Sequence, residues 1–106
     1  MTLLYQDSHL SGFTCSGHAN RGKYGNDLVC SAVSAITQTC VLGFTEVLKL
    51  DPCVRIDDDG IDCRLSLKMD EAVQEKTTLL MQTMCAGLAA VEEAYPGTIQ
   101  TIDREV

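Results

Sequence analysis

The sequence predicts an α/β protein, a two-layer sandwich in the order ββαββαβ, with two helices on one face of an antiparallel or mixed sheet. Two long segments, 27–50 and 69–95, have apolar residues at helical spacing. Two pairs of short apolar segments are separated by turn residues, as in β-hairpins, and one short segment closes the chain. The 106 residues fit a single domain, 1–106, that can bury a core without disulfides or a structural metal.

The N-terminal half is predicted to be a hairpin followed by a helix. Residues 2–6 and 10–16 form the two strands around a short polar turn. The helix over 27–50 follows because its apolar positions recur every three or four residues, with Asn26 as a suitable N-cap. Pro52 lies just beyond this pattern, where a helix would end.

The C-terminal half repeats this order. Strands over 54–56 and 61–67 flank an acidic turn at 57–60, and the second strand alternates apolar with polar residues, which predicts one buried face. The helix over 69–95 stops at a Pro-Gly pair. Residues 98–106 add a final strand at an edge of the sheet.

The composition limits the classes of partner. Fifteen acidic and eight basic residues give a net charge of −7, which is unfavourable for holding a nucleic-acid backbone. A basic protein or peptide is a better partner, unless the charge serves solubility alone. Neither a secretion signal nor a membrane span is indicated, so the expected location is the cytoplasm. One uncovered sheet face and its edges favour a homodimer.

Six cysteines are widely spaced, and no two form a C-x-x-C pair. In a reducing cytoplasm they are expected to remain thiols, most of them acting as small buried apolar residues. Cys30 is the exception, because it falls in the first turn of the predicted helix, where unpaired N–H groups and the helix dipole favour a thiolate. Asp27 and Ser34 share its helix face, which forms a polar group beside an apolar stripe.

His18 lies just before the loop that leads into this helix. Histidine is the usual base for a cysteine nucleophile near neutral pH. Glycines in the loop permit backbone rearrangement, so the loop is expected to order over an extended peptide and bring His18 toward Cys30. The expected substrate-loop residues are Gly17, Ala19, Asn20, Gly22, Tyr24 and Gly25. Spacing alone leaves a structural loop beside a buried thiol equally open.

Two blocks of sequence resemble the signature of the bacterial ribosomal-processing cysteine protease family, Prp. They are Gly17-His18-Ala19-Asn20 and the run GNDLVCSAVS from Gly25 to Ser34. The spacing between the histidine and the cysteine also fits. The resemblance extends over nearly the whole chain in length and element order, but beyond residue 50 only the hydrophobic pattern matches. Ser31 stands where alanine is more usual, and residues 21–24 are the poorest match.

The resemblance implies a cytoplasmic endopeptidase with a Cys/His dyad and no cofactor or metal. Its substrate would be the short N-terminal extension of a large-subunit ribosomal protein, removed by cleavage after aromatic residues. Cys30 would be the nucleophile and His18 its base, with helix-end N–H groups, including that of Cys30, stabilising the oxyanion. Asp27 would orient His18 or hold the loop, and Ser34 would bond to the site from one turn below. Helix capping or solubility explains these two residues equally well.

Other functions remain open. A zinc site would use Cys15 and His18, spaced C-x2-H, but Cys30 and Cys40 lie about 15 Å apart along one helix. Aspartates 57–59 fit a turn and lack the pattern of a calcium loop. A redox sensor would need a resolving cysteine, for which Cys15 is the candidate if the hairpin places it close to Cys30. A non-catalytic module that binds or escorts a ribosomal protein would keep its function after Cys30→Ser.

Overall fold

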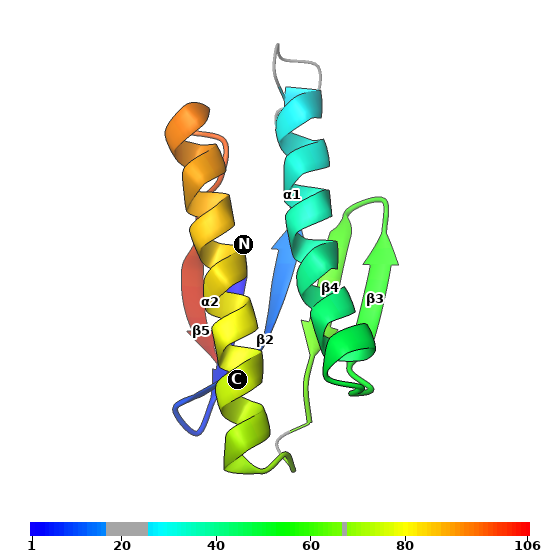
Figure 1. The fold of residues 1–106 in the computed structure, drawn as a ribbon. Coiled ribbons are helices and arrows are strands. Elements are labelled where there is room, and N and C mark those ends of the chain that lie inside the picture. The colour runs from blue at the N-terminus through cyan, green and yellow to red at the C-terminus, as the bar shows by residue number, and fades with distance from the viewer. Residues whose placement is uncertain (17–25, 67) are drawn as a thin grey trace.

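The computed structural model of the chain describes residues 1–16, 26–66 and 68–106, with the side chains of Asn26 and Asp27 outside that description. A five-stranded mixed sheet forms one layer. Helices α1 (Asn26–Leu42) and α2 (Glu71–Ala94) lie together on one face of it (Figure 1). The predicted two-layer sandwich and its ββαββαβ order are confirmed. The N-cap predicted at Asn26 lies outside the described side chains.

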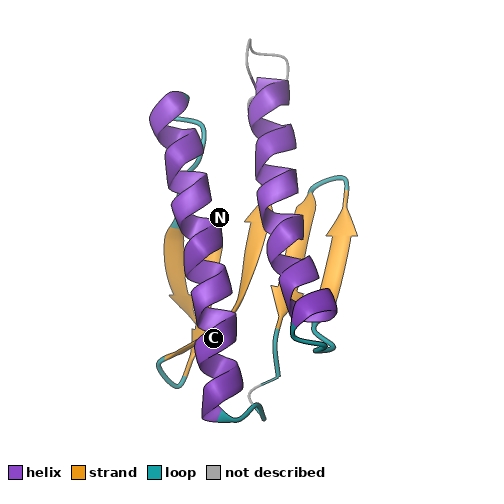
Figure 2. Cartoon of the chain, viewed as in Figure 1, coloured by secondary structure: helices purple, strands orange, loops and turns teal. Residues whose placement is uncertain are grey.

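The sheet has the strand order β3-β4-β2-β1-β5. Figure 2 shows its strands behind the two helices. Its strands are β1 (Thr2–Gln6), β2 (His9–Ser16), β3 (Cys53–Asp57), β4 (Gly60–Arg64) and β5 (Ile102–Glu105). Neighbours pair antiparallel, except that β5 runs parallel to β1. The last strand is therefore at an edge, as predicted, although it is shorter than the segment 98–106.

Both hairpins close in tight turns. Asp7 and Ser8 have φ of 52° and 68°, the two positive values that a two-residue turn matching the strand twist requires. In the second turn, Oδ1 of Asp57 accepts hydrogen bonds from the N–H groups of Asp59 at 2.9 Å and Gly60 at 3.2 Å. The aspartate run thus forms a turn, as predicted.

Helix α1 ends earlier than predicted. It passes into a single π-helical turn, η1 (Gly43–Val47), in which the N–H of Leu48 donates to the carbonyl of Gly43 at 3.0 Å. A Cβ at Gly43 would come within 2.9 Å of the side chain of Leu80 in α2, so glycine permits this close approach of the helices. The apolar pattern that predicted helix up to residue 50 continues beyond the turn, because residues there still pack against the core.

Helix α2 begins with a side-chain cap. Oδ1 of Asp70 accepts a hydrogen bond from the N–H of Val73 at 2.9 Å, which satisfies one of the unpaired donors of the first turn. The helix therefore starts at Glu71, two residues later than the segment predicted from spacing.

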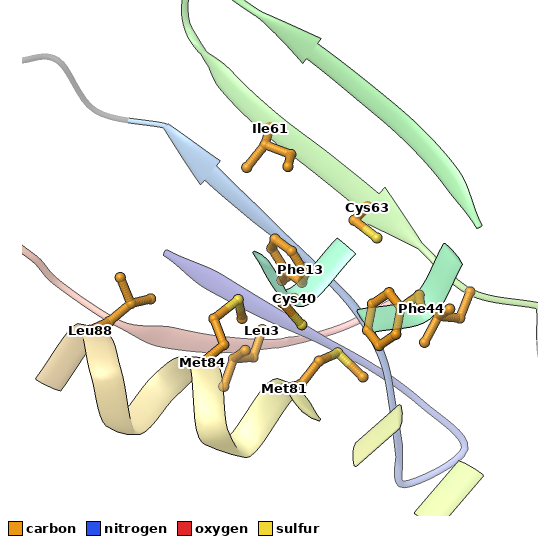
Figure 3. Packing of buried hydrophobic residues seen from close by; sticks show 10 residues of the cluster. Leu3, Phe13, Cys40, Phe44, Ile61, Cys63, Met81, Met84 and Leu88 are labelled. Atoms are coloured by element: carbon orange, nitrogen blue, oxygen red, sulfur yellow. The ribbon is translucent and has the colours of Figure 1, made fainter. Parts of the chain in front are cut away.

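The hydrophobic core lies between the helices and the sheet (Figure 3). Its largest fully buried side chains include Phe13 from β2, Phe44 from η1 and Met81 from α2. By length and composition the segment Leu28–Val47 could cross a membrane, with a mean hydropathy of 1.6. A helix that covers a sheet also meets that criterion, and this segment contributes Phe44 to the core.

The cysteines divide between core and surface. Cys40 and Cys63 are buried, as predicted for most of the six, and lie in the hydrophobic core. The prediction is wrong for Cys53, which is exposed on the edge strand β3, and Cys15 and Cys85 are only half-buried. Thiols therefore occur in very different surroundings within one small fold.

Candidate active site

A cavity of about 710 Å³ opens between the start of α1, the adjoining end of the sheet and the segment that follows α2. Its size lies within the range of small-molecule and peptide side-chain sites, about 300–1,000 Å³. The described residues that line it form three walls from different parts of the chain.

The first wall is one face of α1. Cys30 and Ser34 lie on it one turn apart, so the structure brings together two of the residues predicted from sequence. The same face continues toward the core with Val33, Thr37 and Gln38. The hydroxyl of Thr37 is almost fully buried and donates to the carbonyl of Val33 at 2.8 Å, so its role is local.

Cys30 is half-buried and is the fifth residue of α1. The helix begins at Asn26, one residue before the predicted start, so the thiol follows the first turn instead of lying within it. It remains next to the N-terminal end, where the helix dipole favours negative charge. The prediction of a thiol at the helix N-terminus is correct to within one residue.

The second wall is the end of the sheet. Cys15 and Ser16 from β2 face the cavity together with Gly60 and Ile61 from β4. Gly60 has φ of +152°, and a Cβ there would overlap the carbonyl oxygen of Cys15, so only glycine allows the two strands to meet this closely. Burial raises the pKa of the Cys15 thiol, and the nearby Cys30 raises it further, while the amino group of Met1 lowers it.

Cys15 was the candidate partner of Cys30 on the condition that the hairpin brought it near. Both thiols line the same cavity, and Cys30 is near enough to contribute to the raised pKa of Cys15. The raised pKa disfavours the thiolate form of Cys15, which is the nucleophilic form of a cysteine.

The third wall is formed by Gly97, Thr98, Ile99 and Gln100, which follow α2 without regular secondary structure. Glu92, in the last turn of α2, also lines the cavity. Sequence analysis did not find this wall, since nothing in the spacing of its residues relates them to Cys30. Thr37 and Gln38 were also missed, although their positions seven and eight residues after Cys30 place them on its helix face.

Several predicted site residues lie outside the described part of the chain. These are His18 and the loop residues Gly17, Ala19, Asn20, Gly22, Tyr24 and Gly25. Asp27 is described only as a backbone position in α1. The distance from His18 to Cys30 and the role of Asp27 therefore stay predictions.

The structure defines a small two-layer α/β protein with a ligand-sized cavity and a cysteine near a helix N-terminus on its wall. Comparison with known proteins makes this class more specific. Residues 1–100 match the family model described as cysteine protease Prp. The chain therefore belongs to the Prp family of cysteine proteases.

Individual relatives agree with this assignment. The ribosomal processing cysteine protease Prp of Staphylococcus aureus is 30% identical over 84 residues, 79% of this chain and 77% of that protein. The protein of the same name from Bacillus subtilis is 27% identical over 96 residues, 89% and 86% of the two chains. A crystal structure described as an essential ribosomal processing protease Prp from S. aureus with a substrate peptide has a TM-score of 0.78 and 24% identity. That match covers 97% of this chain and 98% of the other, and shows the same fold.

Proposed function

We propose that this protein is a cysteine endopeptidase that removes a short N-terminal extension from a large-subunit ribosomal protein, cutting after aromatic residues in the cytoplasm. Cys30 is the nucleophile and His18 the base. The observation that carries the proposal is the position of Cys30, half-buried beside the N-terminal end of α1 on the wall of a 710 Å³ cavity. Membership of a cysteine protease family and the ribosomal processing names of the relatives support it.

In the proposed reaction the sulfur of Cys30 attacks the scissile carbonyl carbon as His18 holds the thiol proton. Backbone N–H groups at the start of α1 stabilise the negative charge that develops on the carbonyl oxygen. The C–N bond then breaks, His18 protonates the leaving amine, and a thioester remains on Cys30. Water, deprotonated by His18, hydrolyses the thioester and restores the thiol.

Two residues on the same helix face are proposed to support this dyad. Ser34 lines the cavity one turn beyond Cys30, within reach of a group bound there. Asp27 precedes Cys30 by three residues, a spacing that puts both on one face of α1. We assign Asp27 the orientation of His18 and Ser34 a hydrogen bond to the bound peptide.

The direct test is cleavage of a synthetic peptide that spans the extension junction of the ribosomal protein from the same genome. We expect the wild type to cut one bond, after an aromatic residue. Cys30→Ala and His18→Ala are each expected to lower kcat/KM by at least about 10³-fold, with unchanged circular dichroism. Cys53→Ala is the matched control, because Cys53 is an exposed thiol outside the cavity.

Two results would contradict the proposal. One is peptide binding by the wild type without turnover, which supports the alternative of a binding or escort module. The other is full activity in Cys30→Ala, which would show that another residue is the nucleophile.

A further inference from the structure

The segment that joins α2 to β5 is irregular, yet residues 97–100 form a complete wall of the cavity. We call these four residues the cavity loop. Loops of this kind are held in place by hydrogen bonds to their backbone or they sample several conformations. What holds this loop therefore decides the shape of one side of the site.

A single carboxylate holds the start of the cavity loop. Oε1 of Glu92 accepts a hydrogen bond from the N–H of Gly97 at 2.6 Å. Oε2 accepts from the N–H groups of Ile99 at 2.6 Å and Thr98 at 3.1 Å. The Thr98 hydroxyl lies 3.3 Å from the same oxygen and 2.5 Å from the carbonyl of Tyr95. Three consecutive backbone N–H groups thus point at one side chain.

The end of the cavity loop is attached to the sheet. The carbonyl of Gln100 accepts a hydrogen bond from the amino nitrogen of Met1 at 2.9 Å. The N–H of Ile102 donates to the carbonyl of Met1 at 3.0 Å, where β5 begins to pair with β1. Glu92 and Met1 therefore hold opposite ends of the same four residues.

The position of Glu92 is unfavourable for the helix that carries it. The last turn of α2 has no basic residue, and a carboxylate there meets the negative end of the helix dipole. Its oxygens accept hydrogen bonds from N–H groups of the following loop, and a carboxylate has no proton to donate to the unpaired carbonyls of the helix end. Hydrogen bonds to an ionised acceptor are about twice as strong as neutral ones, which offsets this cost. The same bonds, first that of Ile99 and then that of Gly97, lower the pKa of Glu92.

The turn itself is compatible with a fixed wall. Gly97 has φ of +84°, a conformation that other residues rarely adopt, and a Cβ there would meet no atom within 4 Å. At Gly97 the cavity loop is therefore shaped by backbone conformation and the Glu92 carboxylate, with no packing constraint at that residue.

We propose that Glu92 is a positioning residue for the peptide substrate, because its carboxylate holds residues 97–100 as the wall against which the peptide lies opposite Cys30. This inference rests on the proposed function. Glu92 acts through the loop and does not touch the reacting atoms. Its removal should therefore weaken binding of the peptide while the chemical step proceeds at its normal rate.

Kinetics of two neighbouring variants test the inference. Glu92→Gln replaces one carboxylate oxygen with an NH2 group. That NH2 group faces backbone N–H donors and cannot accept a hydrogen bond from them. We expect KM for the junction peptide to rise on the order of tenfold, with kcat within about twofold. Glu93→Gln makes the same change of charge at an exposed position outside the cavity and should leave both constants within about twofold.

Identical kinetics in the two variants would overturn the inference while leaving the protease intact. So would a loss confined to kcat in Glu92→Gln. Failure of the wild type to cleave is a separate result, which overturns the proposed function itself.

A second measurement remains informative if Glu92→Gln fails to fold or the wild type fails to cleave. The Cys30→Ala protein is titrated with the junction peptide, and its amide signals are followed by ¹⁵N–¹H NMR. We expect the signals of Gly97, Thr98 and Ile99 to shift in proportion to the bound fraction. A different result would overturn the inference. If saturating peptide shifts the amide signals of Ser31 and Val33 but not those of Gly97, Thr98 and Ile99, the peptide does not lie against this wall.

Discussion

Cys30 and Cys40 lie ten residues apart on the same helix, in opposite surroundings. Cys30 is half-buried on the cavity wall beside the helix N-terminus. Cys40 is 4% exposed and packs in the core. Burial, followed by the neighbouring thiols of Cys63 and Cys85, raises the pKa of Cys40 from 9.0 to about 12. The comparison shows that position in the fold, and not residue type, decides whether a thiol of this helix faces the cavity or fills the core.

The core thiols act as small apolar side chains. Cys63 is fully buried on β4, and burial with the charge of Asp62 raises its pKa to about 12 as well. A neutral thiol fills space between helix and sheet without the cost of a buried charge. The difference between these thiols and Cys30 can be measured in four ways.

The largest expected difference is in catalysis. Cys30→Ala should lower kcat/KM for the junction peptide by at least about 10³-fold, whereas Cys40→Ala should change it by less than about threefold per folded molecule. Initial rates at equal concentrations of folded protein measure both. Comparable losses in the two variants would remove the distinction between a reactive and a packing thiol.

The next difference is in chemical reactivity. At pH 8 a thiol with a pKa of about 12 is ionised about 10³-fold less than one with the ordinary value, and burial slows its attack further. Iodoacetamide should therefore label Cys40 and Cys63 at least about 100-fold more slowly than exposed Cys53. Peptide mapping by mass spectrometry at timed intervals gives the rates. Addition of the junction peptide should slow the labelling of Cys30 and leave that of Cys53 unchanged. Rapid labelling of Cys40 in folded protein would be inconsistent with its burial.

A third difference concerns stability at alkaline pH. The folded state keeps the protons of Cys40 and Cys63, whose pKa values are raised to about 12, while the unfolded chain releases them near 9. Their contribution to stability is thus complete below about pH 9 and declines as the pH rises toward 12. At pH 10 the loss is about 1–2 kcal/mol per thiol.

Urea unfolding at pH 8, 9 and 10 measures this decline. The double variant Cys40→Ala/Cys63→Ala is the control and should show a flatter dependence on pH, because both thiols are absent. Parallel curves for the wild type and the double variant would rule out a contribution from these thiols.

The smallest difference is in stability at neutral pH. Cys40→Ala removes a buried sulfur from a packed position and should lower the free energy of unfolding by about 1 kcal/mol. Cys30→Ala should change it by less than about 0.5 kcal/mol, since one side of this residue already faces the cavity. Thermal or urea denaturation compares the two. A larger cost at Cys30 than at Cys40 would indicate that Cys30 serves packing.

Local patterns were enough to predict the elements of the fold. Alternation predicted the buried residues Ile61, Cys63 and Leu65, and helical spacing predicted both helices. The ends of elements were less accurate, because partners in space determine them. Strand β4 ends at Arg64, where its register with β2 reaches Gly12, three residues before the predicted end at 67.

The site was predictable only where it follows one element. Cys30 and Ser34 share a helix face, so spacing alone relates them. This face also meets Cys15 and the cavity loop held by Glu92. Those contacts depend on how β2 and the segment after α2 pack around α1. Contacts between distant segments leave no periodic signal in the sequence. From sequence, a glutamate at the end of a helix is expected to be solvated. Only the structure shows that the following loop folds back and donates hydrogen bonds to Glu92.

Acid quenching during the first turnover shows whether Cys30 forms the proposed covalent intermediate. The wild type is mixed with excess junction peptide, quenched within milliseconds to seconds, digested at low pH and mapped by mass spectrometry. We expect the N-terminal fragment of the substrate to be attached as a thioester to the peptide that contains Cys30. A fragment attached to another cysteine, or cleavage that persists in Cys30→Ala, would contradict it.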